Sequence, residues 1–142
     1  MKILVATDGS KHALSAVKYA VGLLRQMAST ASSITLISVH DDISLRHAKS
    51  FVGHDVVAEY LRELSEKELR PAMKVLDAAG VRHSMVIRTG HVAEEIVHCA
   101  KGGKFNLIVL GAKGRSALAD LLLGSVAQRV LSIARTPVLL VK

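Results

Sequence analysis

The amino-acid sequence predicts a doubly wound α/β fold, in which a five-stranded parallel sheet carries helices on both faces. Short apolar runs alternate with longer segments of helical period along the whole chain. Connections of this length join parallel strands through right-handed crossovers. The runs Leu-Ile-Val-Leu and Val-Leu-Leu-Val are apolar throughout, as expected for strands covered on both faces. In such a sheet, ligands bind at the carboxyl ends of the strands, where the winding reverses.

The first half of the chain is expected to contain two strands and two helices. Ile3–Thr7 is an apolar strand, and Ser10–Ala28 follows as a helix because its apolar residues recur at helical spacing. Ile34–Val39, rich in β-branched residues, is the second strand. His40–Asp55 shows no period and is expected to be a loop. A second helical pattern covers Val57–Gly80, and its final glycine is placed like a helix C-terminal cap.

Pro71 lies inside this second helical pattern. Because proline lacks a backbone N–H and its ring clashes with the preceding turn, a kink or break is expected near Lys67–Arg70. Beyond Gly80 the alternation of strands and helices continues. The remaining expected elements are the strand Arg82–Arg88, the helix His91–Ala100, the strand Phe105–Leu110, the helix Val126–Ala134 and the terminal strand Val138–Val141.

Length and composition are those of one domain, residues 1–142. Half of the residues are apolar, which is enough for a core without disulfides or metals. Cys99 is the single cysteine, so no intrachain disulfide is possible and a reducing compartment is expected. The N-terminus shows no export signal, and no apolar run approaches the length of a membrane span. We therefore expect a cytoplasmic protein without a membrane segment.

The charge balance favours anionic partners. Nineteen Lys and Arg against twelve Asp and Glu give a net charge of +7. The charges are scattered along the chain rather than clustered. With two Phe, two Tyr and no Trp, the chain has few aromatic rings on which bases of single-stranded nucleic acid could stack. A nucleotide is therefore a better candidate ligand than nucleic acid.

A spaced set of glycines follows the fourth expected strand and carries the strongest functional signal. It reads Gly111-Ala112-Lys113-Gly114, then nine residues, then Gly124-Ser125 at the start of a helix. Glycines let backbone amides approach a ligand closely, and the N-terminus of a helix favours phosphate. Together they predict a cradle for a polyphosphate. The pattern is not Gly-x-x-x-x-Gly-Lys-Ser/Thr, so no lysine is set on the phosphates by P-loop geometry.

On these residues the sequence resembles the universal stress protein family. The similarity runs from Val5–Ser10 through Gly90-x-x-Ala93-Glu94 to Pro137–Val141. Its most specific part is the family's ATP-binding pattern of Gly, two residues, Gly, nine residues and Gly-Ser, which the spaced glycines and Ser125 satisfy in full. The resemblance implies a sheet of strand order 3-2-1-4-5 and a member of the ATP-binding branch, with ATP and Mg²⁺ as ligands.

The resemblance also implies which residues contact the nucleotide. Adenine is expected near Ala6 and Val39, at the ends of the first two strands, and Thr7 is also expected to contact the nucleotide. Asp8 is expected to reach the ribose or a phosphate-bound metal. The residues expected around the ribose and phosphates are Leu110, Gly111, Gly114, Arg115, Gly124, Ser125 and Val126. A homodimer is expected through Pro137–Val141, an apolar strand that would otherwise be an exposed edge.

Several of these residues also have a local explanation that needs no nucleotide. Asp8 precedes Gly9-Ser10, so turn or N-cap chemistry accounts for it. Ser125, with Gln128 three residues later, fits a capping box. The seven histidines include no pair at metal-binding spacing on an expected helix, so no dedicated metal site is expected.

The function expected from the sequence is that of an ATP-binding, stress-response regulatory protein. One alternative is a slow ATPase or autophosphorylating enzyme. Asp8 is the only matched carboxylate in the motif and no general base is evident, so efficient phosphoryl transfer is not expected. The other alternative is a partner-binding protein whose nucleotide site is vestigial.

Overall fold

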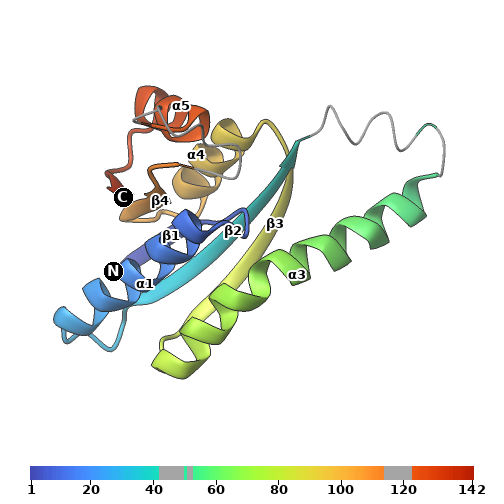
Figure 1. Ribbon diagram of the computed structural model, residues 1–142. Helices are drawn as coiled ribbons and strands as arrows, with labels where there is room; N and C mark the ends of the chain where they lie inside the picture. Colours follow the sequence, from blue (N-terminus) through green and yellow to red (C-terminus); the bar gives the residue numbers. More distant parts are fainter. Residues whose placement is uncertain (42–49, 51–52, 114–122) are drawn as a thin grey trace.

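The computed structural model describes residues 1–41, 50, 53–113 and 123–142 (Figure 1). Its centre is a five-stranded sheet in the order β3-β2-β1-β4-β5. Every neighbouring pair of strands is parallel, which confirms the predicted fold class and strand order. The strands are β1 (Lys2–Ala6), β2 (Ser33–Asp41), β3 (His83–Gly90), β4 (Leu107–Gly111) and β5 (Val138–Val141).

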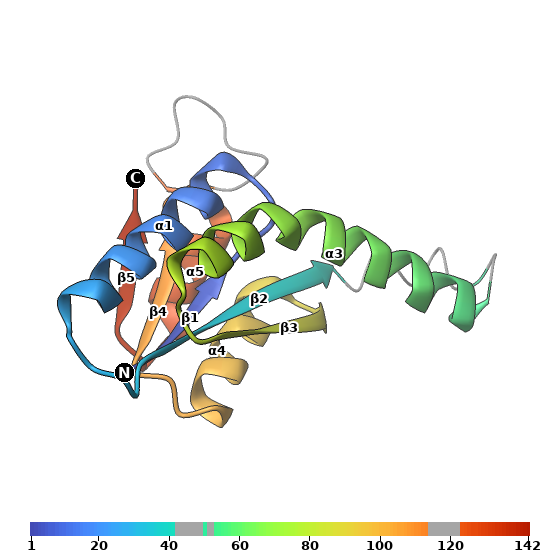
Figure 2. The ribbon, with the colours of Figure 1, turned by 90° about the horizontal axis from the view of Figure 1, so that it is seen from below.

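Two helices cover each face of the sheet. Figure 2 shows α1 (Lys11–Gln26) and α3 (His54–Ala79) side by side on one face. The other face carries α4 (Val92–Gly102) and α5 (Ser125–Ile133). This double layer explains why the central strands β1 and β4 carry unbroken apolar runs rather than alternating ones, because a strand covered on both faces has no solvent side.

The core has two parts, one on each side of the sheet. In β1, Ile3 and Val5 point into the part formed with α1 and α3, whereas Leu4 points into the part formed with α4 and α5. All three side chains are fully buried. Leu76 of α3 closes the first part and Ile96 of α4 closes the second. A polar residue in place of any of these five core residues would therefore disrupt the packing between the sheet and its helices.

The expected break at Pro71 is wrong. Helix α3 runs without interruption over 26 residues and contains Pro71 in its interior (Figure 2). Leu69 and Ala72, on either side of the proline, are both buried against the sheet and α1. Pro71 itself is exposed, so the carbonyl of Lys67 that lacks a helical partner faces the solvent side of the helix. Burial of the opposite side keeps the helix continuous.

The expected loop His40–Asp55 is shorter at both ends than predicted. Strand β2 continues to Asp41 and pairs with β3 as far as Gly90. Helix α3 already begins at His54. Residues 42–49 and 51–52, where the rest of this loop was predicted, lie outside the described residues. The expected strand Phe105–Leu110 is displaced toward the C-terminus, since β4 spans Leu107–Gly111.

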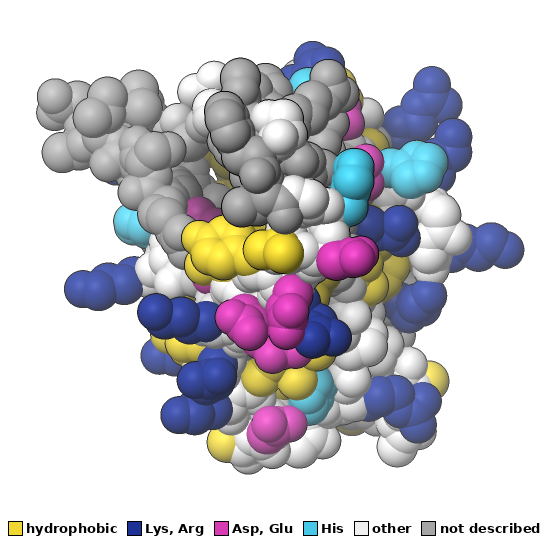
Figure 3. Space-filling view, turned by 90° about the vertical axis from the view of Figure 1, so that its right-hand side faces the viewer, with side chains coloured by type: hydrophobic (Ala, Val, Ile, Leu, Met, Phe, Trp, Pro, Cys, Tyr) yellow, Lys and Arg dark blue, Asp and Glu magenta, His cyan; other side chains and the backbone are white. Residues whose placement is uncertain are grey.

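Basic side chains are distributed over the surface rather than gathered in one field. Figure 3 shows Lys and Arg side chains at several separate places around one face, with acidic side chains between them. This agrees with the scattered charges of the sequence. Within the described part of the chain, no helix is long and apolar enough to cross a membrane.

Candidate functional site

A cavity of about 240 Å³ lies at the carboxyl ends of β1, β2 and β4. The chain winds in opposite directions from β1 toward β2 and toward β4, so the cavity is at the switch point of the sheet, where α/β folds bind ligands. Gly114 and Arg115 lie outside the described residues. All the other predicted site residues line the cavity: Ala6, Thr7, Asp8, Val39, Leu110, Gly111, Gly124, Ser125 and Val126.

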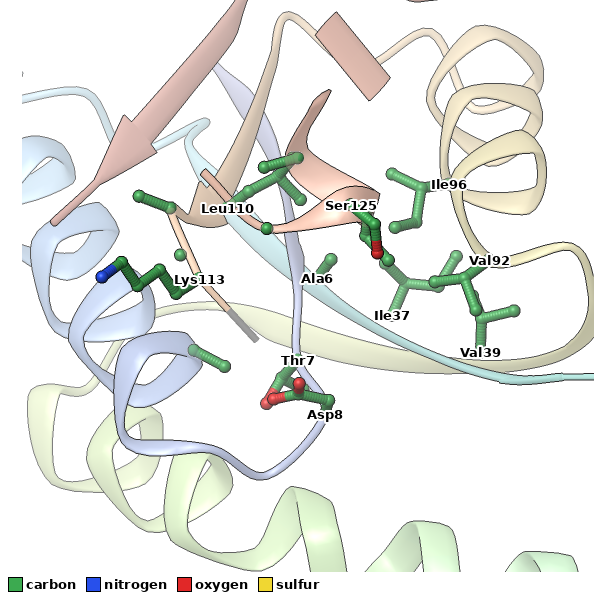
Figure 4. Close-up of a pocket in the computed structure, with 16 residues that line it drawn as sticks. Ala6, Thr7, Asp8, Ile37, Val39, Val92, Ile96, Leu110, Lys113 and Ser125 are labelled. Carbon is green, nitrogen blue, oxygen red and sulfur yellow. The ribbon is translucent and has the colours of Figure 1, made fainter. Parts of the chain in front are cut away.

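One side of the cavity is apolar. Ile37 and Val39 of β2 and Val92 and Ile96 of α4 lie together on this side (Figure 4). Ile37 and Ile96 are almost fully buried. Three of these residues, Ile37, Val92 and Ile96, were not predicted from the sequence. They are ordinary aliphatic residues at core spacing, and only the crossover from β3 to α4 brings Val92 and Ile96 beside Ile37 of β2.

The start of α5 supplies backbone donors to the same cavity. Gly124 is the N-cap residue, and it has no side chain to accept hydrogen bonds from the first turn. The N–H groups of Ser125, Val126 and Ala127 therefore have no acceptor within the helix, as at any helix start. Gly124 itself donates from its N–H to the carbonyl of Ala112 at 2.7 Å, which ties the helix start to the end of β4.

The capping box predicted at Ser125 is wrong. Ser125 is the first residue within α5 and not its N-cap, because Gly124 occupies the N-cap position. The side-chain amide of Gln128 donates to the carbonyl of Leu123 at 3.3 Å, and the N–H of the N-cap residue Gly124 donates to Ala112 rather than to the Gln128 side chain. Ser125 is exposed and lines the cavity. The local explanation that competed with a ligand role for Ser125 thus falls away.

Asp8 has a structural task at the cavity rim. Its Oδ1 accepts a hydrogen bond from the backbone N–H of Ser10 at 2.9 Å. Ser10 in turn is the N-cap of α1, where its Oγ accepts from the N–H of Ala13 at 3.2 Å. The turn interpretation of Asp8 is therefore correct, while the cap itself is Ser10. Asp8 and Thr7 lie next to each other at the end of β1, away from the apolar side (Figure 4).

Gly111 is required by packing, a reason that the sequence did not reveal. A Cβ atom on Gly111 would lie 2.8 Å from the carbonyl carbon and 2.9 Å from the carbonyl oxygen of His12. These atoms belong to the first turn of α1, which crosses the end of β4 at this point. A glycine here allows the close approach of helix and strand, whatever the cavity binds.

The charged side chains that line the described part of the cavity are Asp8 and Lys113. The amino group of Lys113 points toward α1 and away from the apolar side (Figure 4). The two charges are opposite, so the clearest preference for an anion comes from the positive dipole end of α5. Within the described residues, no group of three or more His, Cys, Asp or Glu is placed to hold a metal ion.

An exposed ion pair joins the two helices beside the cavity. Nε of Arg129 in α5 donates to Oε1 of Glu94 in α4 at 3.0 Å. This hydrogen bond lowers the pKa of Glu94, and the positive charge of Arg129 acts in the same direction. Exposed pairs of this kind contribute little to stability.

With this geometry, the chain can be compared with known proteins. The sequence model of the universal stress protein family matches residues 1–142. The chain belongs to the universal stress protein family. A family member from Methanocaldococcus jannaschii, the universal stress protein MJ0531, is 34% identical over 141 residues, which are 99% of this chain and 81% of that protein.

Solved structures support the assignment of this universal stress protein. The structure of MJ0577, also from Methanocaldococcus jannaschii, has a TM-score of 0.83 and 28% identity, and the match covers 99% of this chain and 94% of that one. A universal stress protein solved in complex with cAMP has a TM-score of 0.73 and 26% identity, over 100% of this chain and 97% of that one. Family and fold are therefore shown by sequence and structure alike.

Proposed function

We propose that this universal stress protein binds an adenine nucleotide, with ATP as the ligand, in the cavity between β1, β2, β4 and α5. The observation that carries the proposal is that one cavity joins an apolar side to the start of a helix. An apolar side suits a purine base, and unsatisfied N–H groups at a helix start suit phosphate. The similar universal stress protein that was solved with cAMP also binds an adenine nucleotide, which supports the ligand class.

In this proposal the parts of the cavity have different tasks. Ile37, Val39 and Ile96 hold the base by apolar contact, while the backbone at Ala6 and Val39 offers it hydrogen-bonding groups. The N–H groups of Ser125 and Val126, with the Ser125 hydroxyl, bind phosphate. Gly114 belongs to the same phosphate site in this proposal, as the family pattern implies, and Arg115, the next residue of the loop, is proposed to contact phosphate through its charge.

Mg²⁺ would arrive with the phosphates rather than at a preformed site. Mg²⁺ is commonly held by one or two carboxylates together with substrate phosphates. Asp8 is the carboxylate that lines the described part of the cavity, so it is the protein ligand that this arrangement offers. The regulatory role follows from linkage, because ATP that binds the cavity stabilises the conformation in which the cavity is formed.

Calorimetric titration of nucleotide-free protein tests the binding. ATP, AMP and cAMP are titrated with and without Mg²⁺, and ADP production is followed in the same samples. Gly124→Val should abolish ATP binding, since its side chain would stand where the helix start meets phosphate. Ser125→Ala should weaken it about 10- to 150-fold, because a hydrogen bond to a charged group contributes about 1.5–3 kcal/mol.

The matched control is Ser132→Ala on the same helix. Ser132 is exposed and its hydroxyl donates to the carbonyl of Arg129, away from the cavity. Its removal should leave the affinity for ATP unchanged within about twofold. If no adenine nucleotide binds, or if Ser125→Ala and Ser132→Ala have equal effects, the proposed site is wrong. Steady release of ADP would identify an enzyme rather than a binding protein.

The proposal includes a homodimer formed through β5. This strand is an edge of the sheet and pairs with β4 on one side, where the carbonyls of Pro137 and Val141 accept from Ile108 and Ala112. Alternation along a strand turns the backbone groups of residues 138 and 140 outward, toward a second copy. Sedimentation should show a dimer, and exchange of these two amide hydrogens should slow as protein concentration rises. Concentration-independent exchange would contradict pairing through β5.

A further inference from the structure

A second groove, of about 610 Å³, lies on the α4 face of the sheet and shares no residue with the nucleotide cavity. It begins at the amino-terminal ends of β1, β2 and β3, whereas the cavity lies at their carboxyl ends. The C-terminal end of α4 forms its other wall through residues such as His98 and Gly102. The groove is therefore a separate feature of the fold, and the proposed nucleotide site does not explain its composition.

Strand register places two cations on either side of a serine in this groove. Lys2 of β1 pairs with Ser33 of β2. The next residue of β2, Ile34, pairs with His83 and donates to the carbonyl of Arg82, so Arg82 stands beside Ser33 on the far side. Neighbouring strands are about 4.8 Å apart, which puts the backbones of the two cations about 10 Å apart. Their long side chains can converge on one bound anion.

The two arginines of the groove have no carboxylate partner. Arg82 and Arg88 are both exposed, and within the described residues neither guanidinium group has a hydrogen bond or an ion pair. The described residues that line the groove include no Asp or Glu. Two acids act on residues of the groove, since Asp77 pairs with His83 at 3.1 Å and the charge of Glu95 acts on the Cys99 thiol, but neither is paired with an arginine of the groove. The positive charge of the arginines is therefore open to a ligand.

Lys2 is less available to a ligand than the arginines, because its ammonium group already has partners. Its amino group donates to the carbonyl of Gly103 and lies 4.7 Å from the ring centroid of Phe105. This contact places a positive charge at the C-terminal end of α4, where the helix dipole is negative. The ammonium keeps further N–H donors, since it carries three. Arg82 is consequently the main cation at the floor of the groove, and Lys2 assists it.

Hydroxyl groups line the floor between the cations. Thr35 and Ser84 are paired across β2 and β3, and their oxygens are 3.0 Å apart. One hydroxyl proton serves this contact, and the other can be donated to a ligand. Ser33 adds a third hydroxyl beside Arg82. Guanidinium and hydroxyl donors together are the groups that bind phosphate oxygens.

The groove lacks a platform for stacking bases. Phe105 is the aromatic residue among its described lining, and the ammonium of Lys2 lies over its ring. Single-stranded nucleic acid depends on exposed rings for much of its binding energy.

The positive charge of Arg88 also acts on the Cys99 thiol inside the groove, where it opposes the rise in pKa that burial causes. The ligand that fits is compact and anionic.

We propose that this groove is a second anion site, which binds a compact oligophosphate through Arg82, Lys2 and the hydroxyls of Ser33, Thr35 and Ser84. The site does not rest on nucleotide binding in the other cavity. This site would use part of the net charge of +7 for binding. The nucleotide cavity does not, because its described lining has one acidic and one basic side chain.

Titration of the full chain with inorganic tripolyphosphate at an ionic strength of about 0.15 M, where charges more than about 8 Å apart are largely screened, tests this site. Arg82→Gln should weaken binding about tenfold, the loss expected for one charge-assisted contact. Lys74→Gln is the matched control, because Lys74 is an exposed residue of α3 outside the groove and its loss changes the net charge equally. It should change the affinity by less than about twofold. Equal effects of the two variants would reduce the binding to general electrostatic attraction and overturn the proposal.

Two further measurements separate this site from its rivals. Gly124→Val, designed to block the nucleotide cavity, should bind tripolyphosphate as the wild type does. Loss of binding in this variant would place the anion in the cavity and overturn the proposal, whereas loss of ATP binding alone would leave both proposals standing. A hexaglutamate peptide should bind more weakly than tripolyphosphate. Tighter binding of the peptide that also depends on Arg82 would identify a docking site for an acidic protein instead.

Discussion

Gly111→Ala should destabilise the protein even in the absence of any ligand. The added Cβ would lie 2.8 Å from the carbonyl carbon of His12, whereas carbon atoms pack at about 3.5–4.0 Å. The end of β4 and the first turn of α1 must therefore separate by at least about 0.7 Å. The two closest atoms belong to the backbone, so no side-chain rotation relieves the contact and His12→Ala should not rescue the variant.

The magnitude follows from the cost of overpacking. Inserting one carbon into a packed region costs about 1–3 kcal/mol. For 142 residues, the entropy of unfolding is about 0.3 kcal/mol/K, so Tm should fall by about 3–10 °C. Thermal and urea unfolding of the nucleotide-free protein, followed by circular dichroism, measures the change. Thermal and urea unfolding should show the same loss in the free energy of unfolding.

Gly22→Ala in α1 is the matched control for this prediction. A Cβ on Gly22 would have no atom within 4 Å, and the residue lies in a helix interior. The same substitution should therefore stabilise the protein by about 0.5–1 kcal/mol. If Gly111→Ala unfolds within about 0.5 kcal/mol of the wild type, α1 and β4 do not approach as closely as described, and the packing explanation for Gly111 fails.

Three other predictions concern the helices. Pro71→Ala should raise the free energy of unfolding by about 2 kcal/mol. Alanine restores a helical hydrogen bond in α3, and this gain exceeds the loss from a more flexible unfolded chain. Unchanged urea unfolding would contradict this. Ser10→Ala should cost about 1 kcal/mol by removing the cap of α1, whereas Ser15→Ala, on the exposed side of the same helix, should cost less than half as much in the same assay. The pKa of Glu94 is lower in the folded protein than in the unfolded chain. The contribution of its pair with Arg129 to stability is therefore fully present above the unfolded pKa and is lost as pH falls through the folded pKa. NMR titration should show the lowered pKa in the wild type, and Arg129→Gln should remove the shift.

The cavity shows which kinds of site residue a sequence can reveal. Glycines and a serine at fixed spacing after a strand are rare by chance and have a specific physical use, so Gly124 and Ser125 could be placed at a ligand site in advance. Ile37 and Ile96 could not, because aliphatic residues with the period of a core look the same whether they face a cavity or a packed interior. Their part in the cavity depends on which strand α4 crosses.

The sequence by itself determined the order of elements, the parallel sheet with its strand order and the location of the candidate site at the carboxyl ends of the strands. The order of elements, the parallel pairing and the location of the site follow from hydrophobic period, connection length and turn chemistry, which are local properties of the chain. The strand order is what the resemblance to the universal stress protein family implied. Only the tertiary structure decided that α3 continues through Pro71, that Gly111 accommodates the backbone of His12 and that Lys2 and Arg82 flank Ser33. Each of these depends on contacts between residues far apart in the chain, where burial and strand register outweigh local preference.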